Sequence, residues 1–185
     1  MEWLSDEQQA VWRHFVALLI RFPAALDAEL QKDAGITQFD YIVLSSLSEA
    51  PNRTLRMSEL AATASSSLSR LSHVVSRLET KGWVRRAQCP GDGRFINAVL
   101  TEEGWQKVVA TAPGHVAAVR ELLINTLTRD EFIQLGAISE KVLTAQGIKV
   151  VIPTTEAGLG SRPAQMPVQQ SPDRSQRPGT TSPDS

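Results

Sequence analysis

The stretch SSSLSRLSHVVSRLETKGWVRR, residues 65–86, decides how the rest of the sequence is interpreted. Between Ser67 and Thr80 the apolar residues recur at helical spacing and form one stripe: Leu71, Val74, Val75 and Leu78. A stripe of this kind must face a hydrophobic core. Ser67 is a suitable N-cap residue, and Gly82 stands where a left-handed C-cap is expected. The stretch therefore predicts a helix over residues 67–80 that ends in a turn.

The other side of this helix is basic and polar. It carries arginine, histidine and serine side chains and has no carboxylate before Glu79. An ordinary solvated helix face mixes Glu with Lys at i,i+4 spacing, and this one does not. Arginine and short polar side chains can contact guanine edges and phosphates. The pattern favours a helix that enters the major groove of double-stranded DNA, with these candidate contacts: Ser67, Ser69, Arg70, Ser72, His73, Ser76 and Arg77.

A second, shorter helix precedes this one. Ser58 can cap it, after an extended piece at residues 55–57, and a serine-rich turn at residues 65–67 follows it. Its inward residues are Leu60, Ala61 and Ala64. Two helices joined by a short turn, of which the second is longer and more basic, form the helix-turn-helix pattern.

Two predicted strands follow, at residues 83–86 and 96–100, around the turn CPGDG at residues 89–93. A hairpin after a helix-turn-helix is a wing, and its tip can reach the minor groove, where negative potential attracts a residue such as Arg94. Asp92 can orient that guanidinium through a charge-assisted hydrogen bond, or it can be a turn residue only. The candidate DNA contacts of the wing are Arg85, Arg86, Asp92 and Arg94.

Long helices are expected on both sides of this region. Helical periodicity runs from residue 5 to Gly35, with a kink or restart expected at Pro23, and a helix capped by Thr37 continues toward Pro51. A helix over residues 102–127, bent near Pro113, and one over residues 128–147 follow the wing. The tail, residues 148–185, is rich in Pro, Ser, Thr and Gln, and we expect it to be disordered.

Charge and composition narrow the function classes. The net charge is −1, but residues 51–100 carry eight Lys or Arg against three Asp or Glu, whereas residues 1–50 carry three against eight. A basic middle between acidic flanks is typical of a nucleic-acid-binding module, although segregated surface charge is the alternative. No apolar run is long enough for a membrane span, and the acidic N-terminus does not resemble a signal peptide. The single cysteine fits a reducing cytoplasm, where we expect the protein.

Enzymatic and metal chemistry have no support in the sequence. It contains no nucleophile elbow, no phosphate-binding loop and no glycine-rich dinucleotide motif. The histidines at 14, 73 and 115 are scattered and lack the spacing of zinc ligands. We therefore expect no enzyme, no cofactor and no metal. Cys89 lies in the wing beside several arginines, and we interpret it as a bystander thiol.

Over residues 5–147 the chain resembles the MarR (multiple antibiotic resistance regulator) family of winged-helix transcription regulators. The resemblance is carried by LRMSELAATASSSLSRLSHVVSRLETKGWVRR, by DGRFINAVLTEEG and by the long flanking helices. It implies a dimer whose terminal helices interlock, with one winged lobe in each protomer. It also implies that the helix and wing residues given above meet bases and phosphates, and that Asp92 and Arg94 form the wing's D-x-R motif.

Family members often bind small phenolic or lipophilic ligands between the dimerisation helices and the winged lobe. The resemblance thus implies a pocket to which six residues can contribute, although most of them are better explained as core or interface residues. These are Trp12, His14, Phe15, Phe39, Tyr41 and Trp105.

The sequence as a whole predicts a mainly α fold with a small β-wing. Residues 1–36 and 102–147 are the expected helical dimerisation region, and residues 37–101 are the expected DNA-binding lobe. We expect a homodimeric regulator, a repressor that binds a pseudo-palindromic operator in double-stranded DNA and is released by a small ligand. The alternative is a winged-helix module that binds proteins and uses the disordered tail as a docking segment.

Overall fold

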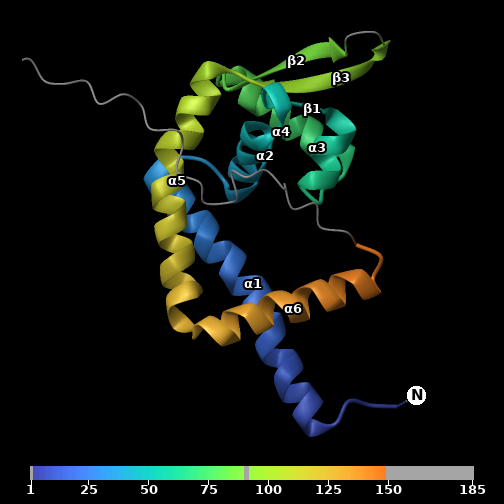
Figure 1. Cartoon of the computed structure of the whole chain (residues 1–185), viewed down its shortest axis with the longest axis vertical. Coiled ribbons are helices and arrows are strands. Elements are labelled where there is room, and N and C mark those ends of the chain that lie inside the picture. The colour runs from blue at the N-terminus through green and yellow to red at the C-terminus, as the bar shows by residue number, and fades with distance from the viewer. Residues whose placement is uncertain (1, 90–91, 149–185) are drawn as a thin grey trace, which may run out of the picture. The chain divides into compact units, whose positions relative to one another are not determined.

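The computed structural model describes residues 2–89 and 92–148, without the side chains of residues 92 and 93. The predicted tail therefore lies, from residue 149 on, outside the described residues. As expected, the fold is mainly α with a small antiparallel sheet. Figure 1 shows the elements, whose bounds are α1 Asp6–Ala34, α2 Gln38–Glu49, η1 Pro51–Arg53, β1 Thr54–Arg56, α3 Met57–Thr63, α4 Leu68–Thr80, β2 Val84–Cys89, β3 Asp92–Leu100, α5 Glu102–Leu122, η2 Ile124–Thr126 and α6 Arg129–Ala145.

Three helices begin directly after a residue that forms a capping box. Ser5, Thr37 and Thr128 each accept a hydrogen bond from the backbone N–H three residues further on, and that third residue's side chain binds back to the cap. The backbone N–H groups of the cap and of the third helical residue, which have no partner within the helix, are thus both hydrogen-bonded. Gly35 ends α1 in the left-handed conformation, with φ of 64°, which a residue without a Cβ adopts readily.

Three element boundaries differ from expectation. The helix α1 runs through Pro23 without a restart; the proline removes only one hydrogen-bond donor, and Leu19, whose carbonyl loses that donor, is exposed to water. The helix α5 ends at Leu122, five residues early, because Leu123 leaves helical geometry and η2 follows. The helix α3 starts at Met57, two residues earlier than a Ser58 cap implies, with the Glu59 carboxylate accepting the N–H of Arg56.

The sheet has the strand order β1-β3-β2, and both pairings are antiparallel. Strands β2 and β3 are longer than predicted and form the wing hairpin (Figure 1). Their register is regular from Val84↔Leu100 to Gln88↔Ile96, but the next pair is Cys89↔Asp92. The residues Gly93 to Phe95 are therefore extra length in β3, and such an irregularity re-aims the side chains that it contains.

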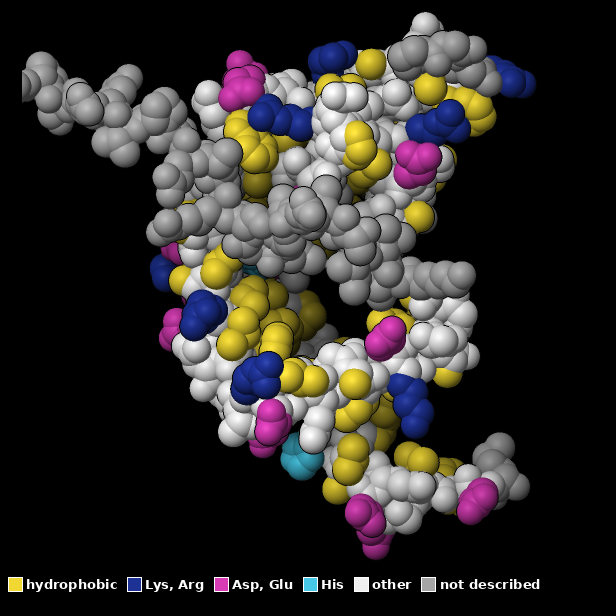
Figure 2. Space-filling view, in the orientation of Figure 1, with side chains coloured by type: hydrophobic (Ala, Val, Ile, Leu, Met, Phe, Trp, Pro, Cys, Tyr) yellow, Lys and Arg dark blue, Asp and Glu magenta, His cyan; other side chains and the backbone are white. Residues whose placement is uncertain are grey.

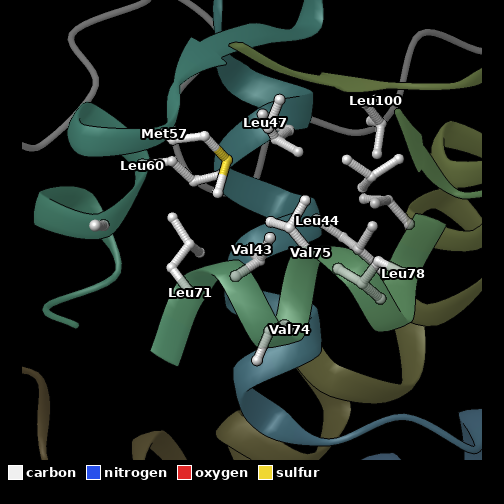
Figure 3. Packing of buried hydrophobic residues seen from close by; sticks show 14 residues of the cluster. Val43, Leu44, Leu47, Met57, Leu60, Leu71, Val74, Val75, Leu78 and Leu100 are labelled. Carbon is white, nitrogen blue, oxygen red and sulfur yellow. The ribbon is translucent and has the colours of Figure 1, made fainter. Parts of the chain in front are cut away.

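The hydrophobic core joins α2, α3, α4 and the sheet. In Figure 3 α4 lies against α2, with Val75 next to Leu44 and Leu71 directed toward Leu60. The four residues of the predicted apolar stripe on α4 are all buried. Each such side chain contributes about 1.5–3 kcal/mol when it is fully buried. The core consists of Val43, Leu44, Leu47, Met57, Leu60, Ala61, Leu71, Val74, Val75, Leu78, Val84, Ala98, Leu100 and Val108.

The helix α5 connects this core to α1. Its start packs against the wing base so closely that a Cβ on Gly104 would lie 2.1 Å from the backbone oxygen of Trp83. Further along, α5 packs beside α1 (Figure 1), and Lys107 Nζ donates to the backbone oxygen of Ala34 at 2.6 Å. This bond places a cation at the C-terminus of α1, where the helix dipole favours it.

The terminal helices are poorly covered. Among the residues that the structure describes, α6 has none that is buried, and α1 buries only Leu26 and Leu30. Hydrophobic side chains lie at the surface of this part of the molecule in Figure 2. The large exposed ones on the two helices are Val11, Trp12, Phe15, Leu18, Leu19, Ile20, Phe132, Ile133, Ile138 and Val142. No helix in the described ranges combines the length and apolarity that crossing a membrane requires.

Candidate nucleic-acid interface

The outer face of α4 has the composition that the sequence predicts. Its candidate contacts are exposed except Ser72, which is half-buried. Ser67 Oγ accepts the backbone N–H of Arg70 at 3.2 Å and so caps the helix. The single carboxylate of α4, that of Glu79, lies in its last turn. The first two turns therefore present hydrogen-bond donors and positive charge, beside the exposed side chain of Leu68, and they do so at the helix N-terminus, which itself attracts anions.

Arg77 is tied to the lobe interior by an ion pair. Its Nη2 lies 2.5 Å from Oδ1 of Asp40, whose side chain is 2% exposed. The other carboxylate oxygen of Asp40 accepts the backbone N–H of Thr37 at 3.1 Å as part of the α2 capping box. A buried carboxylate needs such partners, since its desolvation costs several kcal/mol when uncompensated. The pair therefore fixes α4 to the start of α2.

Arg86 connects the wing to α4. Its guanidinium forms an ion pair with Glu79, and it donates to the backbone oxygen of Ser72 at 2.9 Å and to Ser76 Oγ at 3.2 Å. The backbone N–H of Arg86 also donates to Glu79 at 2.7 Å. A planar guanidinium can make all of these bonds at once, because its donors point in fixed and different directions. Strand β2 is thus fastened to the helix along two turns.

Arg70 is held in a different way. Its guanidinium carbon lies 4.4 Å from the ring centroid of Phe39, which packs against the core. Arg70 and His73 border a surface hollow that also includes Ser69, Thr37 and Asp27. A ring orients a guanidinium without neutralising it. The charge of Arg70 is therefore available to a ligand at the α4 surface.

The wing residues are only partly within the described structure. Arg85 and Arg94 are exposed, whereas the side chain of Asp92 lies outside the described residues, so its predicted pairing with Arg94 remains a prediction. Cys89 is half-buried at the end of β2, and Arg56 Nη2 donates to its sulfur at 3.9 Å. Arg56 also lies over the ring of Phe95, with 4.8 Å between the guanidinium carbon and the centroid.

The structure does not bring the six predicted pocket residues together. Trp12 and Phe15 contact each other on the exposed face of α1, near exposed His14, at a centroid distance of 6.2 Å. Phe39 lies under Arg70, and Trp105 lies under Arg53 at 4.3 Å. Each of these aromatic residues therefore makes a separate local contact, although α1, α2 and α5 pack against one another.

Tyr41 is the exception, because it lies beside a small cavity between α1 and α5. Its ring is 4.5 Å from that of His115, which lines this cavity with Leu30, Asp33 and Thr111. Burial lowers the pKa of His115, and burial together with the nearby Glu49 charge raises the pKa of Tyr41. Among the described residues, His115 Nδ1 is buried and has no hydrogen-bond partner.

Sequence reasoning missed Asp40, Glu79 and Arg56 as residues of this region. Asp40 stands three residues after the cap Thr37, so a capping-box pattern marks it as a structural carboxylate. Glu79 is recognisable as the sole acidic residue of its helix. Arg56 has no sequence signal, because Phe95 and Cys89 approach it only through the sheet.

A helix-turn-helix followed by a hairpin defines the winged-helix class of proteins, and comparisons place the chain within it. The model of the MarR family matches residues 36–96. Sco3205, a MarR family transcriptional regulator from Streptomyces coelicolor solved in complex with DNA, is 44% identical, with a TM-score of 0.76 over 80% of this chain and 92% of that one. AbsC, a MarR family regulator from the same organism, is 37% identical, with a TM-score of 0.73 over 80% and 96%.

The chain belongs to the MarR family, as its resemblance predicts. Among curated proteins it is similar to the transcriptional repressor MprA of Escherichia coli strain K12, at 27% identity over 116 residues. That match covers 63% of this chain and 65% of MprA, so slightly less than two thirds of the repressor's length is represented.

Proposed function

We propose that this protein is a homodimeric, sequence-specific transcription regulator that binds a pseudo-palindromic operator in double-stranded DNA. In this proposal residues 37–101 form the DNA-binding lobe, and residues 1–36 and 102–147 form the dimerisation region. Membership of a family of transcriptional regulators supports it, as does the structure of Sco3205, which is similar to this chain, in complex with DNA. A two-fold operator follows from a two-fold dimer.

The observation that carries the proposal is the charge on α4. Its first two turns expose Ser69, Arg70 and His73 with no carboxylate on the helix beside them, and its one acidic residue is engaged by Arg86. Asp27 of α1, which borders the same hollow, accepts the backbone N–H of Gln38. The surface therefore has uncompensated positive charge and several hydrogen-bond donors. The phosphate backbone and the base edges of a major groove supply the matching anions and acceptors.

The basic residues then divide into two roles. Arg70, Ser69 and His73 contact DNA, as does Arg94 from the wing. Arg77 and Arg86 hold α4 and β2 in place through Asp40 and Glu79, and they act on DNA affinity by positioning. A contact residue neutralises phosphate, so its loss reduces the salt dependence of binding, whereas the loss of a positioning residue weakens binding at an unchanged slope.

The dimer is supported by the exposed apolar surface of α1 and α6. Side chains such as Leu19 and Ile138 are more than half exposed in the single chain. An exposed patch of this extent marks an interaction surface, and a second copy offers the same apolar residues in return.

Repression and release by a small phenolic or lipophilic ligand complete the proposal. The similarity to MprA, described as a transcriptional repressor, supports repression. The cavity beside Tyr41 and His115 has a volume of about 50 Å³, so a phenolic ligand would have to widen it before its hydroxyl could bond the unpartnered Nδ1 of His115. The cavity lies between α1 and α5, and α5 connects the winged lobe to α1.

The test is DNA binding by the purified full chain across a salt series. The probe is a duplex that the protein selects from a random-sequence library, and sheared genomic DNA is the competitor. We expect competitor-resistant binding with a log–log salt slope of about −4 or steeper, since each neutralised phosphate contributes about 0.9. Binding that the competitor abolishes, or a shallow slope, would contradict the proposal and favour a protein-docking module.

Two arginine variants separate the roles. Arg70→Ala should weaken binding and make the salt slope shallower by about two, one phosphate in each protomer. Arg86→Ala should weaken binding with the slope of the wild type retained. Equal slopes for the two variants would overturn the division of roles.

A further inference from the structure

The arginines near the DNA-facing surface differ in what holds their guanidinium groups. Arg77 and Arg86 are held by the carboxylates of Asp40 and Glu79, which neutralise them. Arg70 lies on the ring of Phe39 and Arg56 on the ring of Phe95. Within the described residues, neither of these two forms an ion pair. The ring-held arginines are thus oriented and still charged.

Arg56 reaches the wing through the sheet. It is the last residue of β1, where it pairs with Asn97 of β3, and its side chain is exposed. The guanidinium extends over Phe95 and donates to the sulfur of Cys89, the last residue of β2. The side chain therefore runs across β3 toward the distal end of the hairpin.

At this end of the hairpin Arg56 contacts the residue that follows Arg94 in the chain. Phe95 directly follows Arg94, and both lie in the stretch of β3 that has no regular partner in β2. The guanidinium over the ring of Phe95 thus lies against the neighbour in β3 of Arg94, the residue expected to enter the minor groove. The wing presents one arginine from β3 and one from β1.

Stacking leaves the edge of a guanidinium available for binding. Where the flat face lies on the ring, the N–H donors in its plane point outward, and those not bonded to the Cys89 sulfur can match a pair of phosphate oxygens. A bidentate, charge-assisted contact of this kind is strong and directional. A lysine at the same position would retain the charge but neither the stacking nor the fork.

We propose that Arg56, supported on Phe95, binds the phosphate backbone beside the wing and is a second DNA-contacting arginine of this hairpin. The proposal rests on the proposed DNA-binding function. It assigns Phe95 a positioning role: the ring presents the guanidinium but does not itself touch DNA.

The experiment measures affinity and salt slope by fluorescence anisotropy on the library-selected duplex. Arg56→Ala should bind about tenfold more weakly, and its log–log salt slope should be shallower by about two for the dimer. Phe95→Leu retains an apolar side chain without the aromatic face, and it should lose most of the same affinity. The double variant should be no weaker than Arg56→Ala, because both changes remove one contact.

Controls separate this inference from the function on which it rests. Arg120→Ala removes an exposed arginine of α5 and should bind as the wild type does. Thermal unfolding should show each variant folded. A wild type that fails to bind DNA would refute the proposed function itself. A wild type that binds steeply, with Arg56→Ala retaining its affinity and slope, would overturn the role of Arg56 alone, and additive losses in the double variant would overturn the role of Phe95.

Discussion

The winged lobe and the terminal helices of this chain differ in how far their apolar side chains are buried. In the lobe Val43, Leu44 and Leu47 are completely buried by contacts from the same chain. In α6, by contrast, no residue of the described structure is buried, although Phe132, Ile138 and Val142 are large and apolar. The difference teaches that the lobe's core is complete in one chain, whereas the terminal helices need another surface.

The largest test of this comparison is Leu44→Ala. The substitution removes a fully buried side chain from the lobe core, and it should lower the free energy of unfolding by about 2–5 kcal/mol. Urea denaturation followed by circular dichroism at fixed protein concentration measures the change. Leu19→Ala, on the exposed face of α1, should cost much less at a concentration at which both variants are monomeric. Equal costs would break the comparison.

A charge on α6 tests the other half. Ile138 is 60% exposed in the single chain, and Ile138→Asp would bury a carboxylate in a dimer interface, so the dimer dissociation constant should rise at least ~100-fold. Light scattering at micromolar concentration should report a monomer.

Ala137→Asp is the matched control for Ile138→Asp, since it adds the same charge at an adjacent position that faces away from the apolar side of α6. It should remain dimeric. A dimeric Ile138→Asp variant would show that α6 does not use this face for association.

Replacing one glycine in each region by alanine compares how closely the lobe and α6 are packed, because each change adds a single methyl group. Gly104→Ala forces a Cβ against the Trp83 carbonyl at the junction of lobe and α5, and it should destabilise the protein by about 1–3 kcal/mol. Gly136→Ala in α6 meets nothing within 4 Å and should stabilise by about 0.5–1 kcal/mol through helix propensity. Thermal or urea unfolding measures both. A destabilising Gly136→Ala would indicate that α6 is packed more closely than a single chain shows.

The smallest expected effect is a pH dependence from His115. Burial lowers its pKa in the folded state below the ordinary value of 6.5. The unfolded chain therefore takes up a proton first, and stability should be full above about pH 6.5 and decline as the pH falls below it. His115→Phe should flatten this part of the stability profile, whereas His14→Phe, at an exposed position, should not. An unchanged profile in His115→Phe would contradict the assignment of this pH dependence to His115.

Much of the fold could be predicted because its signals are local. The caps Ser5, Thr37 and Thr128 and the apolar stripe of α4 act within a few residues of the chain. The errors arose where distant residues decide. The end of α5 at Leu122 and the length of the wing strands depend on packing and pairing across the fold.

In the candidate site, too, local features could be predicted from the sequence and contacts between distant residues could not. The exposed position of Arg70 on α4 follows from helical periodicity, and the MarR family follows from the motifs around it. The ion pair between Arg77 and Asp40 could not be predicted in this way, because the two residues are 37 positions apart in the chain.

The sequence by itself determined which residues are helical, which faces are apolar and where the basic charge is concentrated, because periodicity and capping are short-range. Only the tertiary structure decided which arginines are neutralised and which remain charged, since that depends on whether a carboxylate or an aromatic ring meets each guanidinium in space. Arg86 and Arg56 illustrate this, because their neighbours in the sequence do not show which arginine positions the wing and which is a candidate DNA contact. Their partners in space, Glu79 and Phe95, distinguish the two roles.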